Sequence, residues 1–245
     1  MPSVPVTYRG MILVSTEYKA NDRVLKFLTR DSGLLDIYVK RAGKLNSSNA
    51  FISVPYMLCD LTCSDSHGYL YLKSGSIIES NKNIMNDLDL MLTAAHFADV
   101  LTDISRQSDN SREAYELSCY AYYHLADKPG KRKLFLAVFN WRVLTILGLT
   151  VSYSVTNDTQ TEISDSGIYY VSVTGGEIYS GKREGSNVSV LTGKSIRVLN
   201  FIASSEIDKI FGLTVPDDMA ERLADFTMNS LSFQLEKDYK SRFVL

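Results

Sequence analysis

Residues 34–44 read LLDIYVKRAGK, and this stretch decides how the first third of the chain is expected to fold. Leu35, Ile37 and Val39 fall on one face of an extended segment, while Asp36, Tyr38 and Lys40 fall on the other. Such alternation with a period of two predicts a half-buried strand. The strand leads into a glycine-containing loop that carries three cations: Lys40, Arg41 and Lys44.

Four more strand-like segments surround this one, near residues 6–17, 23–30, 55–63 and 69–79. In the last of them Leu70 and Leu72 point one way, and Tyr69, Tyr71 and Lys73 point the other. Turn signals such as KAND, DSG and SDSHG separate the segments. Five short strands in residues 1–80 predict a small closed barrel.

The hydrophobic period becomes helical after residue 80. Helices are expected near 86–105, 112–127, 131–149, 193–204 and 216–235. Between them, residues 150–190 are polar and β-like, with a hairpin expected at Gly175-Gly176. The predicted fold class is therefore α+β, with a five-stranded barrel in 1–80 and a mostly helical domain in 81–245 that carries a small β-rich insert.

Composition is that of an ordinary soluble globular protein: 245 residues, 45% hydrophobic, 22% charged and a net charge of -2. Residues 1–80 hold nine Lys/Arg against seven Asp/Glu, whereas 151–245 hold nine against thirteen. This asymmetry favours an anionic ligand on the N-terminal part. Three cysteines argue against a disulfide framework, and MPSVPVTYRG is no signal segment, so a reduced, cytoplasmic protein is expected.

Two segments approach the phosphate-binding loop pattern. Gly176–Lys182 has the glycine-to-lysine spacing, but Arg183 stands where Ser or Thr would hold magnesium. Gly193-Lys194-Ser195 has the correct ending, but Val188 replaces the first glycine. The favoured interpretation is a hairpin turn in the first case and a helix N-terminus in the second.

A metal or catalytic site is also disfavoured. Cys59, Cys63 and His67 recur every four residues, but their surroundings are predicted to be strand, where buried cysteines are the commoner outcome. His96 and His124 lie in separate predicted helices without nearby ligand partners in sequence. No G-x-S-x-G elbow or H-E-x-x-H motif is present, and we expect no metal, no cofactor and no enzyme.

The remaining signal is cationic and aromatic. On a small barrel, cations can follow a nucleic-acid backbone and aromatic rings stack on bases, at about 1–3 kcal/mol per base. The alternative interpretation is that these lysines and arginines only solvate the outer face of the barrel. The candidate DNA-binding residues are Arg23, Lys26, Arg30, Tyr38, Lys40, Arg41, Lys44, Tyr69, Tyr71 and Lys73, with Lys19 and Tyr18 beside them.

The order of these features resembles the family of the bacterial DNA repair and recombination mediator RecO. Its R-V-x-x-F-T-x-x-x-G stretch is similar to Arg23-Val24, Phe27–Thr29 and Gly33, and the basic loop follows. The family's F-x-x-R-L-L-x-x-L-G helix end is similar to residues 139–148. The Gly175-Gly176 pair and the final KSRFVL add short matches, so the resemblance covers nearly the whole chain.

The resemblance implies an N-terminal OB-fold and a non-enzymatic protein that binds single- and double-stranded DNA and anneals complementary strands. It implies cooperation with RecR in loading RecA onto DNA coated by single-strand-binding protein (SSB), in the bacterial cytoplasm and associated with the nucleoid. It also implies binding of the acidic, apolar SSB tail. The residues expected for that tail are Lys131, Arg132, Lys133, Leu134, Phe135, Phe139 and Arg142.

One departure from the family concerns zinc. Many members carry two C-x-x-C pairs flanking the segment that corresponds to 150–185, but this chain has no cysteine after Cys119. A zinc ribbon cannot form there, and the hairpin is expected to hold through Ile168, Tyr170, Val173 and Ile178, or else to stay mobile. The alternative function is a protein-interaction adaptor whose barrel binds a partner protein rather than DNA.

Overall fold

The structure is a computed structural model that describes residues 4–44, 47–107, 111–174, 176–185 and 187–239. The chain divides into two compact units, Met1–Pro129 and Gly130–Leu245. The predicted matches at Gly175 and in 240–245 lie outside the described residues. No helix within the described ranges is long and apolar enough to cross a membrane.

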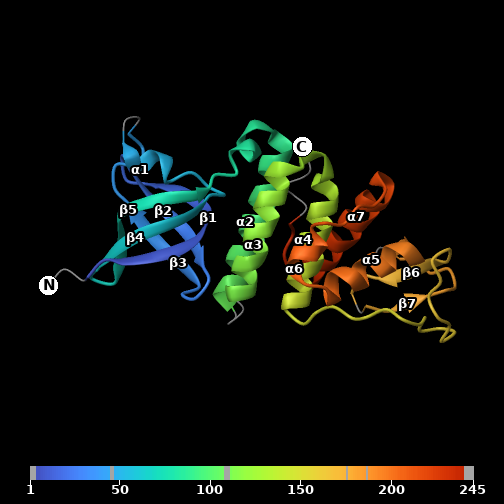
Figure 1. Cartoon of the computed structure of the whole chain (residues 1–245). Coiled ribbons are helices and arrows are strands. Elements are labelled where there is room, and N and C mark those ends of the chain that lie inside the picture. Colours follow the sequence, from blue (N-terminus) through green and yellow to red (C-terminus); the bar gives the residue numbers. More distant parts are fainter. Residues whose placement is uncertain (1–3, 45–46, 108–110, 175, 186, 240–245) are drawn as a thin grey trace. The chain divides into compact units, whose positions relative to one another are not determined.

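The first unit opens with a closed five-stranded barrel, which confirms the predicted OB-fold (Figure 1). The strands pair in the order β1-β2-β3-β5-β4, and β1 closes the barrel on β4. β3 and β5 run parallel and the other pairs antiparallel. The bounds are β1 (Val6–Tyr18), β2 (Asp22–Thr29), β3 (Leu34–Val39), β4 (Leu58–Ser66) and β5 (Tyr69–Glu79), with α1 (Ser48–Phe51) between β3 and β4.

The barrel core contains the apolar faces that the alternation predicted. Ile37, Val39 and Leu72 are buried in it, with Leu35 and Leu70 packed at its edge. Gly10 allows β1 to pass closely over β2, because a Cβ atom there would lie 2.5 Å from the Leu28 carbonyl oxygen. Buried apolar area of this kind is the main stabilising term for a small domain.

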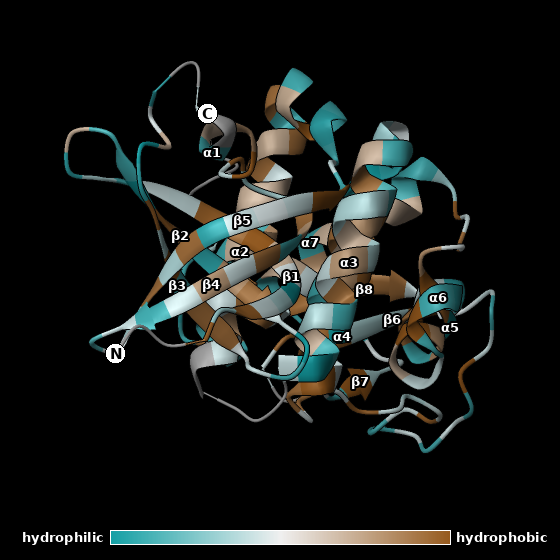
Figure 2. Ribbon diagram, turned by 60° about the vertical axis from the view of Figure 1, so that its left-hand side comes forward, coloured by the Kyte–Doolittle hydropathy of each residue, from teal (hydrophilic) through white to brown (hydrophobic). Residues whose placement is uncertain are grey.

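Two helices complete the first unit: α2 (Leu88–Gln107) and α3 (Ser111–Asp127), preceded by the 3₁₀ turn η1 (Lys82–Asn86). Tyr122 on α3 is fully buried, and its hydroxyl donates to the Ala94 carbonyl of α2 over 3.2 Å. Its ring stacks on Tyr56 at 5.2 Å between centroids. Tyr122 therefore joins α2, α3 and the segment before β4. Figure 2 shows α3 in alternating hydrophobic and hydrophilic bands. This is the pattern of an amphipathic helix, which packs on the protein through one apolar face.

The second unit is mostly helical and carries a three-stranded sheet in the order β7-β6-β8. α4 packs on α7, and the Trp141 ring of α4 lies 5.7 Å from the Phe226 ring of α7 between centroids. The bounds are η2 (Pro129–Lys131), α4 (Arg132–Ile146), β6 (Ile168–Ser172), β7 (Ile178–Tyr179), β8 (Val188–Thr192), α5 (Gly193–Ser204), α6 (Ile207–Ile210) and α7 (Asp217–Gln234).

The inward face of the insert was only half predicted. Val173 and Ile178 are buried as expected, but Ile168 is 60% exposed and Tyr170 is half-buried. Tyr169 and Val171 turn inward instead, and the Tyr169 hydroxyl accepts a hydrogen bond from the Ser164 amide over 2.8 Å. A shift of one residue along a strand exchanges its two faces, and local alternation does not say which face meets the helices.

Polar contacts hold together this insert, which contains no cysteine. The Asn157 amide donates to the Ile178 carbonyl over 2.7 Å, and the Ile178 amide donates to Asn157 Oδ1 over 2.8 Å. The Asp158 carboxylate accepts bonds from the backbone amides of Ser180 and Gly181 over 3.0–3.1 Å. The Gly181 amide, followed by the Ser180 groups, holds the pKa of Asp158 well below its usual range.

We predict that acid loosens the turn at Ser180–Gly181. Because the folded-state pKa of Asp158 is depressed, its ionised form stabilises this turn above the unfolded pKa of about 3.9, and the contribution fades as the pH falls from there toward the folded value. Asp158→Asn should remove it even at pH 7. Hydrogen exchange of the Ser180 and Gly181 amides measures this. Equal protection in wild type, Asp158→Asn and the control Asp208→Asn would contradict the assignment.

Candidate nucleic-acid interface

Four tyrosines form an aromatic cluster on the outer face of the barrel; we call them the tyrosine quartet. Tyr38 lies at its centre, with ring centroids 5.4 Å from Tyr18, 5.5 Å from Tyr69 and 5.6 Å from Tyr71. Three of these tyrosines belong to the outward faces predicted from alternation. Tyr18 and Tyr69 are 41% and 52% exposed, so part of the aromatic surface of this cluster faces solvent.

Strand pairing brings the quartet together from three segments that are distant in sequence. Tyr38 of β3 is directly opposite Tyr71 of β5 in their parallel pairing, and Tyr69 lies two residues earlier on the same face. The β4–β5 turn consists of His67 and Gly68, both with positive φ (57° and 81°), as in the two-residue turns that join antiparallel strands. This tight turn fixes Tyr69 at the first position of β5, opposite Ser66.

Two lysines lie over rings of the quartet. Lys19 Nζ is 5.1 Å from the centroid of Tyr18, and Lys40 Nζ is 5.2 Å from that of Tyr71. Both distances are within the range of cation–π attraction. Burial, followed by the neighbouring tyrosines, raises the pKa of Tyr38, so its phenol stays protonated at neutral pH. The quartet thus combines neutral aromatic surface with two positive charges at its rim.

The basic loop after β3 is held by its backbone while its cations are exposed. The Arg41 amide donates to Asp22 Oδ1 over 2.8 Å, and the Gly43 amide donates to the Asn21 carbonyl over 2.9 Å. The Asn49 side chain donates to the Lys40 carbonyl over 2.9 Å. The side chains of Lys40, Arg41 and Lys44 are exposed at the surface. Cations that contact the phosphates of a nucleic acid need to be exposed in this way.

The other predicted cations of the barrel have protein partners. Lys26 forms an ion pair with Asp36 at 2.5 Å, and Arg30 lies 3.7 Å from Glu116 of α3. Arg23 is half-buried and donates to the Ser15 hydroxyl over 3.3 Å. Lys73 is exposed on β5. The structure therefore separates the exposed loop cations and Lys73 from three cations whose charge is offset or half-buried.

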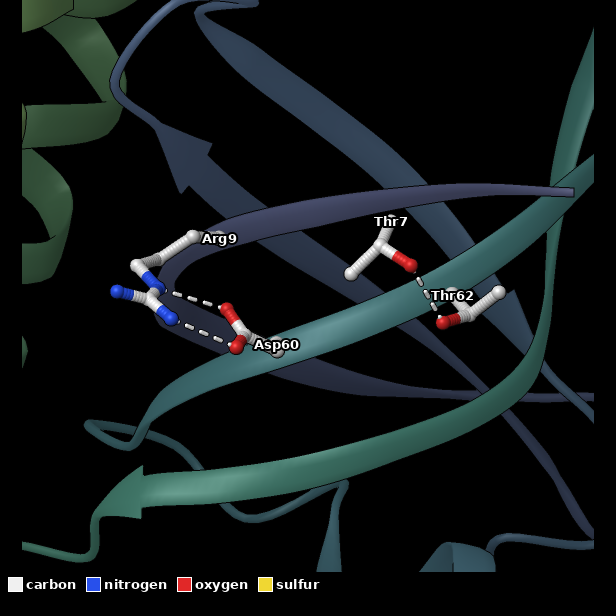
Figure 3. Close-up of polar contacts among 4 residues, drawn as sticks. All are labelled: Thr7, Arg9, Asp60 and Thr62. Atoms are coloured by element: carbon white, nitrogen blue, oxygen red, sulfur yellow. Dashed lines mark hydrogen bonds and ion pairs between the residues drawn. The ribbon is translucent and has the colours of Figure 1, made fainter.

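Sequence reasoning missed Arg9, which is bound to Asp60 across the β1–β4 pairing (Figure 3). Arg9 Nε and Nη2 donate to the two Asp60 carboxylate oxygens, each over 2.8 Å, and the Thr7 and Thr62 hydroxyls lie 2.8 Å apart beside them. The arginine lowers the pKa of Asp60. No sequence signal identifies this pair, since the strand register alone places the two residues opposite one another.

The residues predicted to bind an SSB tail have structural partners in the second unit. Leu134, Phe135 and Phe139 are buried at 3% exposure or less, so none of them lines its surface. Arg142 Nη1 donates to the carbonyls of Ile202, Ala203 and Ser205 at the end of α5, over 3.0–3.3 Å.

The lysines of that set bind neighbouring groups. Lys131 Nζ donates to the Thr214 hydroxyl over 2.8 Å, and Lys133 forms an ion pair with Glu221. Arg132 is half-buried.

The alternative chemistries find no support in the described residues. Cys59 and Cys63 are buried in the barrel core, and burial raises their thiol pKa values to about 12 and about 11. No group of three His, Cys, Asp or Glu residues in the described ranges is placed to hold a metal ion. Thr192 caps α5 by accepting from the Ser195 amide, and Ser195 is 1% exposed, which confirms the predicted helix start.

Two family models match the chain. The one described as "Recombination protein O N terminal" matches residues 1–81, and the one described as "Recombination protein O C terminal" matches residues 85–243. Similar curated proteins are each named "DNA repair protein RecO". That of Clostridium acetobutylicum is 18% identical over 95% of this chain and 94% of its own. That of Acetivibrio thermocellus is 21% identical over 94% and 92%, and that of Bacillus pumilus is 26% identical over 57% and 54%.

Proposed function

The chain belongs to the recombination protein O family, and we propose that it serves DNA repair and homologous recombination by binding DNA through its N-terminal barrel. The observation that carries this proposal is the exposed loop of Lys40, Arg41 and Lys44 beside the tyrosine quartet. Cations that follow phosphates and rings that stack on bases are the two components of single-strand binding on small barrels.

In this proposal the loop cations bind phosphates of single- and double-stranded DNA, and no covalent chemistry takes place. Neutralising phosphates lowers the repulsion between two strands held on one protein, which favours annealing. RecR, RecA and SSB are the partners that the family resemblance implies, in the bacterial cytoplasm at the nucleoid. Because the apolar residues first expected for the SSB tail are buried, a tail site would have to use apolar side chains other than Leu134, Phe135 and Phe139.

A salt titration of binding to a labelled single-stranded oligonucleotide tests the proposal. The logarithm of the binding constant should fall linearly with the logarithm of salt concentration, at about 0.7 per neutralised phosphate. Repeating the titration with an SSB tail peptide as competitor separates the DNA site from the tail site. Undetectable DNA binding, together with a partner-protein complex that survives high salt, would instead support the adaptor whose barrel binds protein.

A further inference from the structure

A cavity of about 710 Å³ opens beside the tyrosine quartet. Its walls include Tyr38, Tyr69, Leu34 and Leu70 and the Lys26–Asp36 pair. Sites for small ligands occupy about 300–1,000 Å³ and combine apolar and aromatic walls with a few polar groups. The cavity therefore has the size and lining of a site for one planar, partly polar molecule.

Charge favours a base over a phosphate in this cavity. Its cation, Lys26, is 2.5 Å from the Asp36 carboxylate, and the two charges offset one another. A phosphate would meet the carboxylate as well as the ammonium group, whereas an uncharged base meets leucines, tyrosine rings and a donor–acceptor pair. The exposed cations of the neighbouring loop, Lys40, Arg41 and Lys44, provide the phosphate contacts instead.

Tyr69 is the most exposed tyrosine of the quartet. It is 52% exposed, lines the cavity, and stands nearly perpendicular to Tyr38, at 85°. The lysine contacts of the quartet fall on Tyr18 and Tyr71. The tight turn at His67-Gly68 fixes the backbone position of Tyr69, which lowers the ordering needed when a ligand stacks on its ring.

We propose that this cavity binds one unpaired nucleobase, stacked on Tyr69, and that it gives the barrel a preference for single-stranded over duplex DNA. The inference rests on the proposed DNA-binding function and assigns a separate role to each part of the site. The loop cations bind phosphates of either form of DNA. Bases in a duplex are paired and stacked on one another, and they reach a protein pocket only after extrusion from the stack.

Binding of a single-stranded oligonucleotide, a duplex of equal length and an abasic single strand tests the proposal. Tyr69→Ala should weaken single-strand binding about ten-fold, since base stacking on one aromatic side chain is worth roughly that factor or more. Duplex and abasic binding should change less than two-fold, and the salt slope should not change. Tyr69→Phe should retain wild-type affinity. A 2-aminopurine in the strand should be quenched by wild type and Tyr69→Phe, but less by Tyr69→Ala.

Tyr123→Ala is the matched control, because Tyr123 is 48% exposed in the same unit but does not belong to the quartet. It should bind all three probes like wild type, and thermal unfolding of each variant checks that it is folded. If wild type binds DNA and folded Tyr69→Ala binds single strands equally well, the base pocket is wrong while the DNA-binding function stands. If wild type binds none of the probes, the proposed function itself fails.

Discussion

Lys40→Gln, Arg41→Gln and Lys44→Gln, combined in one variant, are expected to lower the salt slope of single-strand binding by about 2, at roughly 0.7 per lost phosphate contact. Affinity at low salt should fall together with the slope. Glutamine removes each charge but keeps a long polar side chain. Arg41 has a positive φ of 61°, and glutamine carries a Cβ atom as arginine does, so the substitution adds no backbone strain there. Fluorescence anisotropy at several salt concentrations measures the slope.

The control for net charge is a second triple variant, with Lys182, Lys194 and Lys209 changed to Gln. All three lysines are exposed in the second unit, so the total charge changes by the same amount. This variant should keep the wild-type slope. If the two triple variants lower the slope equally, the loop is not a specific phosphate site and binding reflects overall charge. If the loop variant leaves the slope unchanged, the loop assignment is wrong.

Arg142→Met is expected to destabilise the second unit by about 2–3 kcal/mol. Nη1 of the side chain donates to three carbonyl oxygens at the end of α5, so its two hydrogens are shared among them. A hydrogen bond to a charged group contributes about 1.5–3 kcal/mol net of its exchange with water. A positive charge at a helix C-terminus adds a favourable dipole interaction. Methionine keeps the aliphatic packing of the arginine stem and removes the donors.

Urea unfolding followed by tryptophan fluorescence measures the loss of stability in the second unit, which contains Arg142. Trp141 is the single tryptophan of the chain, is 3% exposed, and precedes Arg142 on α4. Lys133→Met is the control, because its ion pair with Glu221 lies at the surface and such pairs contribute about 1 kcal/mol or less. Similar unfolding midpoints for the two variants would mean that the α5 contacts of Arg142 are not structurally important.

The family resemblance and most of the fold were predictable from the sequence. The period of two in residues 35–39 and 69–73 identified the buried faces correctly, because a barrel strand has one side in the core and one in solvent. The helical period after residue 80 located the five long helices within a few residues of their observed ends. Both features are local, so a short stretch of sequence contains the information that determines them.

The candidate site was predictable only in part. The outward direction of Tyr38, Tyr69 and Tyr71 followed from alternation, but their contact around one centre depends on the β3–β5 pairing. The sequence also gave no basis for ranking the cations. Asp36 offsets Lys26 and Glu116 lies near Arg30, while the loop cations stay exposed, and these partners come from other segments of the fold.

By itself, then, the sequence determined the order of strands and helices, the buried faces of β3 and β5, and the excess of cations over anions in the first 80 residues. The tertiary structure alone decided that Arg142 caps α5 and that Tyr169 rather than Tyr170 turns inward. It also decided that a neutral cavity lies beside Tyr69. The physical reason is that periodicity is a property of neighbouring residues, whereas ion pairs, caps and cavities form between residues that only the folded chain brings together.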